Sequence, residues 1–325
     1  MTAPIVPTPA IPRRISFFFT GERLSFCRYM TFLSFRRLNP DWQIDLYTSG
    51  SAAINRKPWG TPEQQDFFSY RGPDYFDRLD ALSVNVIPWQ PPEQFIRRKS
   101  KSSSLNPVHQ SDICRWEVLR DAGGFYADTD ILFVRPLDER IYPAIVATGA
   151  DVALYLLRDN LPIGFLAARP GTSFYADVYS AAVEHCDQQE YQSAGADAIR
   201  RVLGFPLTAE EAVGPSETRM RLAARYPSLL FTNLFPQSIY PWAWNQVGKI
   251  FKELLSVSSL TAGIHWFAGA RLSQSWNGSL THENFRGKRY VNTWTKYAAR
   301  IWEMPAEGMA AENLVVSPAE GEILQ

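Results

Sequence analysis

The chain has 325 residues, with 33 Lys and Arg balanced by 33 Asp and Glu, so its formal net charge is zero. This balance argues against binding to an anionic membrane or to nucleic acid through a broad basic field, without excluding nucleic acid. Hydrophobic residues make up 46% of the sequence, enough for one large α/β domain or a domain with a substantial insertion. Cys27, Cys114 and Cys186 are isolated in the sequence, which favours a reducing compartment over a disulfide framework or a zinc site.

No run of the sequence is expected to cross a membrane. The most apolar early run, residues 15–19, is much shorter than the ~20 residues that a spanning helix needs. Residues 1–14 contain four prolines and lack the apolar core of a signal peptide, so we expect a flexible N-terminal arm there. We expect one domain over residues 15–304 and a weakly ordered tail over residues 305–325. The expected location is cytoplasmic, with a peripheral contact to a membrane left open.

The first part of the chain has a strand–helix–strand pattern. Residues 15–19 predict a buried strand, residues 22–38 a helix, and residues 42–47 a second strand. This order predicts a parallel pair of strands with a crossover helix between them. A short strand is expected at residues 84–87. The basic run at residues 97–101 either contacts a phosphate or an acidic acceptor, or is solvated surface, as charge runs in loops usually are.

Residues 111–138 are the most informative part of the chain. Ser111 is a good helix N-cap, and the two glycines at 123–124 are a typical C-terminal stop, because glycine accepts the left-handed conformation. An apolar pattern over residues 125–134 then predicts a strand that a polar triplet interrupts. His109 precedes the expected cap, and we expect it to face solvent.

The polar triplet is Asp128-Thr129-Asp130, which puts two carboxylates one residue apart. An ionised carboxylate is costly to bury unless it is paired or bound to a metal. An Asp-x-Asp triplet at the end of a strand can offer oxygen ligands to a divalent cation that also holds a diphosphate. The alternative is a solvated polar turn between two short strands, and a triplet by itself favours that alternative.

Beyond this stretch the pattern alternates between strands and helices. Two strands are expected over residues 151–157 and 163–168, joined by a turn at residues 158–160. The aromatic, proline-rich segment 235–242 is expected to pack under a loop, and Thr281-His282-Glu283-Asn284 to be structural. Helices are expected at residues 172–186, 194–203 and 216–225.

A longer pattern surrounds the triplet: Ser-Asp-x-x-Arg, a double glycine and Tyr-x-Asp-x-Asp. Its fixed positions are Asp112, Arg115, Tyr126, Asp128 and Asp130. This pattern resembles the sugar-binding DXD region of retaining glycosyltransferases, most closely those of family 32 and more distantly the clostridial toxin glucosyltransferases. The resemblance implies an α/β chain with the GT-A-type nucleotide-sugar-binding fold, a mixed central sheet flanked by helices.

The resemblance also implies a divalent cation, Mn²⁺ or Mg²⁺, and a UDP- or GDP-hexose as donor. Asp130 is expected to coordinate the cation directly, and Asp128 to bind ribose or sugar hydroxyls or to reach the cation through water. His265 would complete the metal shell, or else be a hydrogen-bonded core residue. Phe18 and Phe19 either stack on the nucleotide base of the donor or belong to the hydrophobic core. The further positions expected to contact the donor are Phe18, Phe19, Thr20, Gly214, Ser275 and Trp276.

Three of the pattern residues have expected contacts of their own. Asp112 and Arg115, one helical turn apart, share a face and can hold sugar hydroxyls while Arg115 pairs with a carboxylate or phosphate oxygen. The alternative for this pair is a surface ion pair worth only tenths of a kcal/mol. Tyr126 is expected on the same side of its strand as Asp128, with its hydroxyl directed at a phosphate or sugar oxygen.

The chain departs from the family pattern at three points. Ile163 stands where relatives commonly have an asparagine before a strand, and Asp159 or Asn160 in the preceding turn could supply a polar group instead. The gap between His265 and Ser275 is longer than usual, and no tryptophan ends the first strand. Because of these departures, a non-catalytic protein that binds a nucleotide sugar remains the alternative function.

The function that the sequence favours is a metal-dependent, retaining glycosyltransferase. It would move a hexose from a nucleotide sugar to a saccharide or another hydroxyl acceptor, in surface polysaccharide or glycoconjugate synthesis. No carboxylate stands out as a covalent nucleophile, so we expect front-face attack with the leaving phosphate taking the acceptor proton. A protein side chain or a modified nucleic-acid base is an alternative acceptor. A phosphodiesterase or nucleotidyltransferase is disfavoured, because further metal-ligand spacings are not apparent.

Overall fold

The computed structural model describes residues 11–49, 70–96, 105–156, 161–207 and 214–305. The predictions for most of the N-terminal arm, the basic run at 97–101, the turn at 158–160 and the C-terminal tail lie outside these residues. Ile11 is buried and Arg14 opens the first strand, so residues 11–14 pack with the domain.

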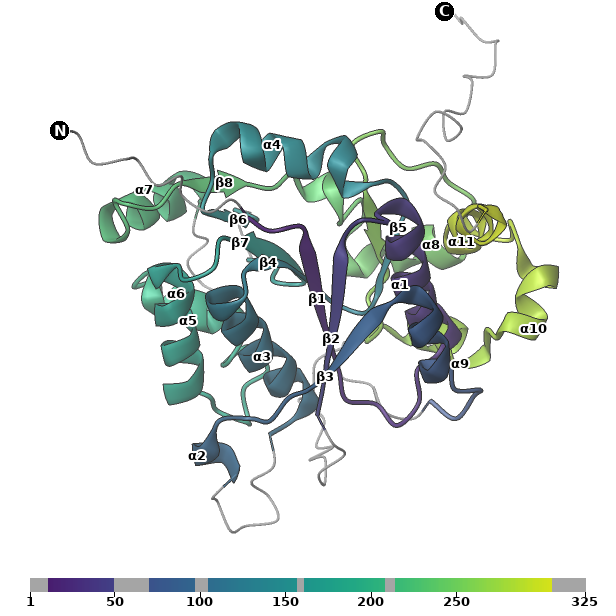
Figure 1. The fold of residues 1–325 in the computed structure, drawn as a ribbon, viewed down its shortest axis with the longest axis horizontal. Coiled ribbons are helices and arrows are strands. Elements are labelled where there is room, and N and C mark those ends of the chain that lie inside the picture. The colour runs from purple at the N-terminus through teal and green to yellow at the C-terminus, as the bar shows by residue number, and fades with distance from the viewer. Residues whose placement is uncertain (1–10, 50–69, 97–104, 157–160, 208–213, 306–325) are drawn as a thin grey trace, which may run out of the picture.

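A central sheet runs through the middle of the molecule (Figure 1). The first three strands and β4 are mutually parallel, whereas β7 is antiparallel to both β4 and β6. The predicted α/β fold with a mixed sheet flanked by helices is therefore confirmed. In the described residues the strands follow the order β3-β2-β1-β4-β7-β6-β8, with bounds β1 (Arg14–Phe19), β2 (Gln43–Thr48), β3 (Val84–Pro88), β4 (Gly124–Ala127), β6 (Val152–Leu154), β7 (Phe165–Ala168) and β8 (Phe231–Asn233).

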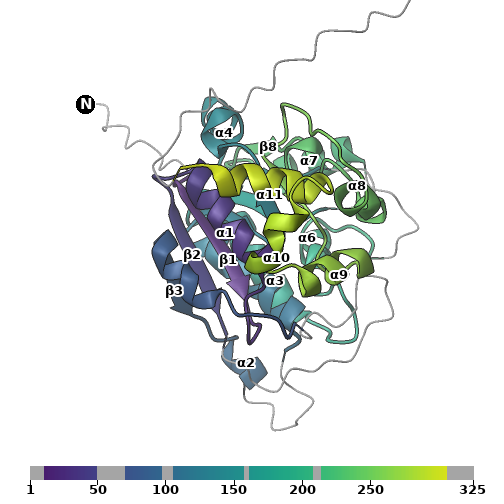
Figure 2. The same ribbon diagram turned by 90° about the vertical axis from the view of Figure 1, so that its right-hand side faces the viewer.

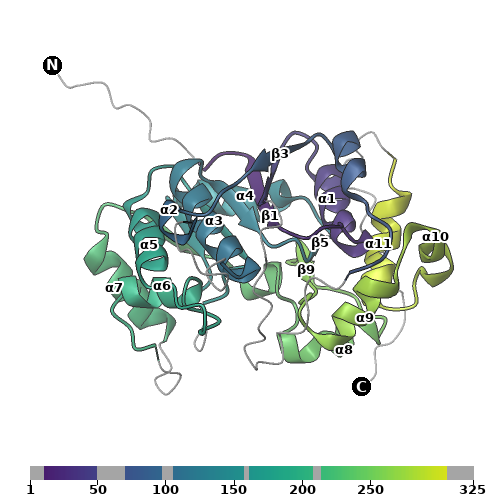
Figure 3. The ribbon, with the colours of Figure 1, turned by 90° about the horizontal axis from the view of Figure 1, so that it is seen from below.

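Helices cover both faces of this sheet, as the view from below shows (Figure 3). Successive β1 residues point to opposite faces: Phe17 joins one buried cluster with α1 and α11, and Phe18 joins the other with α3 and α5. The helices are α1 (Phe26–Leu38), α2 (Glu93–Ile96), α3 (Pro107–Asp121), α4 (Ile141–Thr148), α5 (Ser173–Glu184), α6 (Ala196–Val202), α7 (Pro215–Arg225), α8 (Val247–Phe251), α9 (Arg271–Ser279), α10 (His282–Phe285) and α11 (Thr293–Glu303).

The parallel opening predicted from the sequence is confirmed, with α1 crossing between β1 and β2. The helix starts later than predicted, at Phe26, because the Ser25 hydroxyl accepts the backbone N–H of Arg28 and caps it. In the view turned by 90°, α1 lies against the sheet under α11 (Figure 2). Residues 20–25 connect the carboxyl end of β1 to α1.

The start of α3 was predicted wrongly. The helix begins at Pro107, and the N-cap is Asn106, whose side chain accepts the N–H of Val108. Proline suits the first helical position because its missing N–H would lack an intrahelical partner there anyway. Ser111 is therefore inside the helix, and His109 is fully buried with Nε2 3.0 Å from the Glu190 carbonyl oxygen, whereas solvent exposure was expected.

The strand predicted over residues 125–134 is in fact two strands in two sheets. After β4 the chain leaves the central sheet, and β5 (Ile131–Phe133) pairs antiparallel with β9 (Gly263–His265) in a separate two-stranded sheet. Gly123 and Gly124, between α3 and the body of β4, both have positive φ, 63° and 82°, in agreement with the predicted helix stop. The polar triplet thus lies where the chain changes sheets. In the described part of the chain, no helix is long and apolar enough to span a bilayer.

Candidate functional site

The triplet is held at the junction of the two sheets by backbone hydrogen bonds on both sides. The Asp128 N–H donates to the Gly164 carbonyl at 2.8 Å, next to β7. The Asp130 carbonyl accepts the Trp266 N–H at 2.9 Å, directly after β9. The two carboxylates therefore stay close to one another while the chain passes from one sheet to the other.

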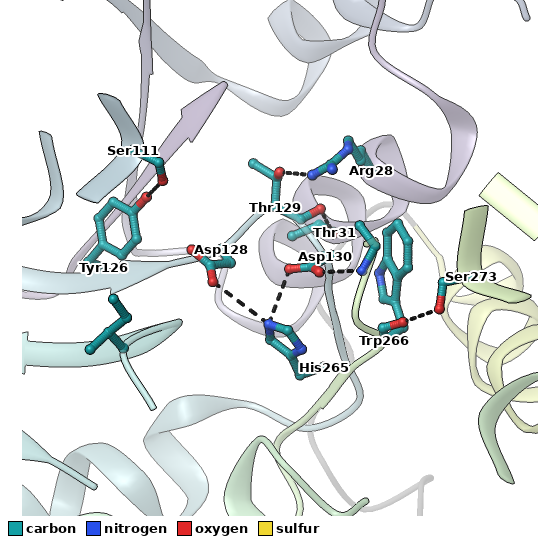
Figure 4. Close-up of polar contacts among 12 residues, drawn as sticks. Arg28, Thr31, Ser111, Tyr126, Asp128, Thr129, Asp130, His265, Trp266 and Ser273 are labelled. Atoms are coloured by element: carbon teal, nitrogen blue, oxygen red, sulfur yellow. Dashed lines mark hydrogen bonds and ion pairs between the residues drawn. The ribbon is translucent and has the colours of Figure 1, made fainter. Parts of the chain in front are cut away.

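Asp128, Asp130 and His265 converge at one point (Figure 4). Each offers a ligand atom, and these atoms all lie within 4.8 Å of one another. His265 Nε2 is 3.3 Å from Asp130 Oδ1 and 3.7 Å from Asp128 Oδ2. Asp130 Oδ2 accepts the Ala268 N–H at 2.7 Å, which orients Oδ1 toward the imidazole. Two carboxylate oxygens and one imidazole nitrogen form a donor set that fits a divalent cation.

On the α3 side, Arg115 joins the charged groups into a network. Its Nη2 is 3.3 Å from Asp112 Oδ1 and 2.9 Å from Asp128 Oδ1, and its Nη1 donates to the Ile163 carbonyl at 2.7 Å. The Asp112 and Arg115 side chains are each only 4% exposed, so the alternative of a surface ion pair is wrong. Ile163 thus contributes a polar group through its backbone.

These contacts shift the pKa values of the three charged groups. Burial raises the pKa of Asp112 to about 7, although the Arg115 charge acts in the opposite direction. Burial also acts to raise the pKa of Asp128, but Arg115 and His265 outweigh it and hold that pKa below its usual range. For Arg115, burial is outweighed by Asp128, Tyr126 and Asp112, and its pKa is raised. The network therefore keeps Asp128 ionised beside the cation site.

Tyr126 lies behind this network. Its ring is fully buried with the Arg115 guanidinium 4.5 Å from the ring centroid, and its hydroxyl is 2.8 Å from Ser111 Oγ (Figure 4). This position orients Arg115 from the rear. Gly195, near the start of α6, leaves room for the network, because a Cβ there would be 2.8 Å from Asp112 Oδ2.

Three more residues predicted to contact the donor lie at the end of β1: Phe18, Phe19 and Thr20. Phe18 is buried edge-on against Trp89, whereas Phe19 is half-buried and has the Arg28 guanidinium 5.8 Å from its ring centroid. Thr20 follows β1, and its buried hydroxyl has no hydrogen-bond partner among the described residues.

The sequence also predicted donor contacts in the later part of the chain, at Gly214, Ser275 and Trp276. Gly214 caps α7, which lies at the outer edge of the molecule (Figure 1). Ser275 is exposed on α9, and Trp276 stacks on Phe251 with ring centroids 5.9 Å apart. Among the described residues, no recorded contact joins Ser275 or Trp276 to the Asp–Asp–His cluster.

Sequence reasoning missed Arg28, in the first turn of α1. Its Nη1 donates to the Thr129 hydroxyl, between the two aspartates (Figure 4). Burial lowers the pKa of Arg28, and the charges of Asp130 and Asp128 act in the opposite direction. An arginine in a helix pattern carries no sequence signal for such a role, since it is an ordinary helix former.

Tyr240 and Gly164 were also missed. The Tyr240 ring packs on the His265 ring with centroids 5.1 Å apart, a contact that the sequence did not predict. A Cβ at Gly164 would lie 2.8 Å from the Tyr240 hydroxyl, 2.5 Å from Asp128 Oδ2 and 3.2 Å from His265 Nε2. The missing side chain of Gly164 therefore keeps the space between these three groups open, and the Tyr240 hydroxyl borders that space.

A family model supports the class of protein that this site indicates. Residues 30–146 match the family described as "Glycosyltransferase sugar-binding region containing DXD motif", a segment that includes Asp112, Arg115 and both aspartates of the triplet. The resemblance predicted from the sequence is therefore confirmed. The chain carries a glycosyltransferase sugar-binding region, and it is an enzyme of the glycosyltransferase class. No curated protein matches the chain.

Several solved structures share broad similarity with the chain. The PaToxG glycosyltransferase has 14% identity and a TM-score of 0.40, covering 90% of this chain and 87% of that one. Mouse xyloside xylosyltransferase 1 has 8% identity and a TM-score of 0.38, covering 78% and 96%. The glycosyltransferase GlyE of Streptococcus pneumoniae TIGR4 has 9% identity and a TM-score of 0.35, covering 90% and 61%. Similarity at this level carries no argument about donor or acceptor.

Proposed function

We propose that the chain is a metal-dependent, retaining glycosyltransferase that moves a hexose from UDP or GDP to a hydroxyl acceptor. The observation that carries the proposal is the convergence of Asp128, Asp130 and His265 at one point inside a glycosyltransferase sugar-binding region. The acceptor we favour is a saccharide, in surface polysaccharide or glycoconjugate synthesis in the cytoplasm.

A divalent cation bound by these three residues would neutralise charge on the diphosphate of the donor. Asp130 is ready to bind it, because the Ala268 N–H holds one carboxylate oxygen and the other faces His265. Asp128 is held by Arg115 through Oδ1, while its Oδ2 faces His265. A carboxylate fixed in this way loses little conformational entropy when a ligand binds.

Given retention, the carboxylates on the α3 side favour front-face attack over a covalent intermediate. Asp112 is 3% exposed and paired with Arg115, and Asp128 shares the same guanidinium. Pairing with a guanidinium lowers the reactivity of both carboxylates as covalent nucleophiles. In the proposed reaction the leaving phosphate oxygen takes the acceptor proton. An NMR spectrum showing an inverted product would contradict this part of the proposal.

The test is a hydrolysis screen of UDP- and GDP-sugars with Mn²⁺, with EDTA and Asp130→Asn as controls. We expect slow release of nucleoside diphosphate from one donor, lost in both controls. Metal-dependent donor binding without turnover, persisting with a panel of saccharide acceptors, would indicate a binder. Absence of any metal-dependent binding would reject the proposed function.

A further inference from the structure

Arg28 is fixed at the edge of the Asp–Asp–His cluster, on the side away from α3. Its Nη1 donates to the Thr129 hydroxyl, and its guanidinium lies 5.8 Å from the Phe19 ring centroid and 5.9 Å from that of Trp266. Two aromatic rings and one hydrogen bond therefore hold the group in place beside Asp130 (Figure 4). A guanidinium held this way is preorganised for a ligand.

Arg28 makes no direct ion pair among the described residues, although the charges of Asp130 and Asp128 act on it from a longer distance. Within those residues, no carboxylate oxygen lies within 4.0 Å of its guanidinium. Arg115, by contrast, contacts two carboxylates on the other side of the triplet. A half-buried guanidinium without a direct ion pair is available to an anionic ligand, and part of its desolvation cost is already met by the fold.

A role confined to holding the triplet explains Arg28 less well. The Thr129 carbonyl already accepts the Thr31 hydroxyl at 3.0 Å, and the flanking aspartates are tied by backbone bonds to Gly164 and Trp266. The triplet is thus anchored without Arg28. The bond to Thr129 uses one of the roughly five N–H donors of a guanidinium and leaves the others for a ligand.

We propose that Arg28 binds the diphosphate of the donor and stabilises the charge on the departing nucleoside diphosphate. This inference rests on the proposed function. The bond from the anomeric carbon to the phosphate oxygen breaks, and its electron pair stays on that oxygen. The acceptor oxygen bonds to the anomeric carbon, and the acceptor proton passes to the phosphate. Arg28 stays protonated throughout and contributes hydrogen bonds and charge, as guanidinium–phosphate pairs do.

The inference is tested by calorimetric titration of the full chain with Mn²⁺ alone, and with UDP and GDP in the presence of Mn²⁺. We expect Arg28→Gln to weaken binding of the preferred nucleotide by roughly tenfold to a hundredfold, the range of a lost hydrogen bond to a charged group. Affinity for Mn²⁺ alone should be unchanged or higher, because a nearby positive charge is gone. Arg28→Lys, which keeps the charge but not the fork, should lie between wild type and Arg28→Gln.

Thr129→Val is the matched control, since it removes the bond to Arg28 and keeps the guanidinium. We expect nucleotide affinity within about threefold of wild type, because the guanidinium is kept and the Phe19 and Trp266 rings still border it. If Thr129→Val lowers nucleotide affinity as much as Arg28→Gln does, Arg28 is only a positioning residue, and the inference is overturned.

Two further outcomes separate the inference from the proposed function. Nucleotide binding that survives Arg28→Gln, or a parallel loss of Mn²⁺ and nucleotide affinity, overturns the role of Arg28 and leaves the proposed function standing. A wild-type protein that binds neither nucleotide with Mn²⁺ overturns the proposed function itself. If Arg28→Gln does not fold, as judged by its circular dichroism, Arg28→Lys decides alone, and wild-type affinity in that variant contradicts the inference.

Discussion

The two sides of the Asp128-Thr129-Asp130 triplet differ in how their charged groups are paired. On the α3 side Arg115 contacts two carboxylates and a carbonyl, and its side chain is 4% exposed, so that region is neutralised within the protein. On the β9 side two carboxylates and an imidazole gather at one point, and Arg28 lies beside them. The α3 side is a fixed support for the triplet, and the β9 side is arranged to bind ligands. Asp128 belongs to both, because one oxygen faces each side.

Replacing Arg115, which holds the carboxylates of the α3 side, should have the largest effect, a loss of stability. Arg115→Met leaves the buried Asp112 and the partly exposed Asp128 without their common partner, and we expect about 3–5 kcal/mol less unfolding free energy. Urea denaturation measures this loss. Arg225→Met removes an exposed ion pair with Asp177 and should cost under about 1 kcal/mol. Similar losses in the two variants would show that the buried network is not a special support.

Filling the open space should come next. Gly164→Ala places a methyl group against Asp128 Oδ2, the Tyr240 hydroxyl and His265 Nε2. We expect donor turnover to fall by roughly tenfold to a hundredfold, since small displacements at a reacting centre have effects of that size. Gly248→Ala in α8 has nothing within 4 Å of the added carbon and serves as the control. Unchanged turnover in Gly164→Ala would mean that ligands do not use this space.

A smaller effect is expected from the hydroxyl that borders the same space. Tyr240→Phe keeps the ring on His265 and should lower kcat/KM for the donor by about fivefold to tenfold, the worth of one hydrogen bond. Tyr155→Phe is the matched control, because that neighbouring hydroxyl lies 3.0 Å from Ser238 Oγ in the interior. It should lose about 1 kcal/mol of stability and no turnover. Equal turnover losses in both variants would argue for a packing effect.

The supporting side should also show a pH dependence of stability. The pKa of Asp112 is raised from 3.8 to about 7, so the folded protein binds its proton more tightly than the unfolded chain does. Its contribution to stability is present below about pH 4 and is lost as pH rises toward about pH 7. Asp112→Asn should therefore show a flatter unfolding free energy over that range in urea titrations. A slope identical to wild type would contradict the shift.

Local sequence signals predicted the strand–helix–strand opening and the helix stop at Gly123-Gly124, because turn and cap chemistry acts over a few residues. The same reasoning misplaced the start of α3, since Ser111 and Asn106 are both acceptable caps and the Asn-Pro pair was the stronger signal. It also merged β4 and β5 into one strand. Both segments are apolar, and only their pairing partners assign them to different sheets.

The sequence by itself determined the class of the protein and the acidic half of the site, because Asp112, Arg115, Asp128 and Asp130 lie in one short, recognisable pattern. The tertiary structure decided what surrounds them. His265 reaches the aspartates because β9 pairs with β5, and Tyr240 packs on that histidine. Arg28 arrives on α1 from the far side of the triplet. Such contacts join residues distant in the chain through burial and strand pairing, which leave no local spacing in the sequence to recognise.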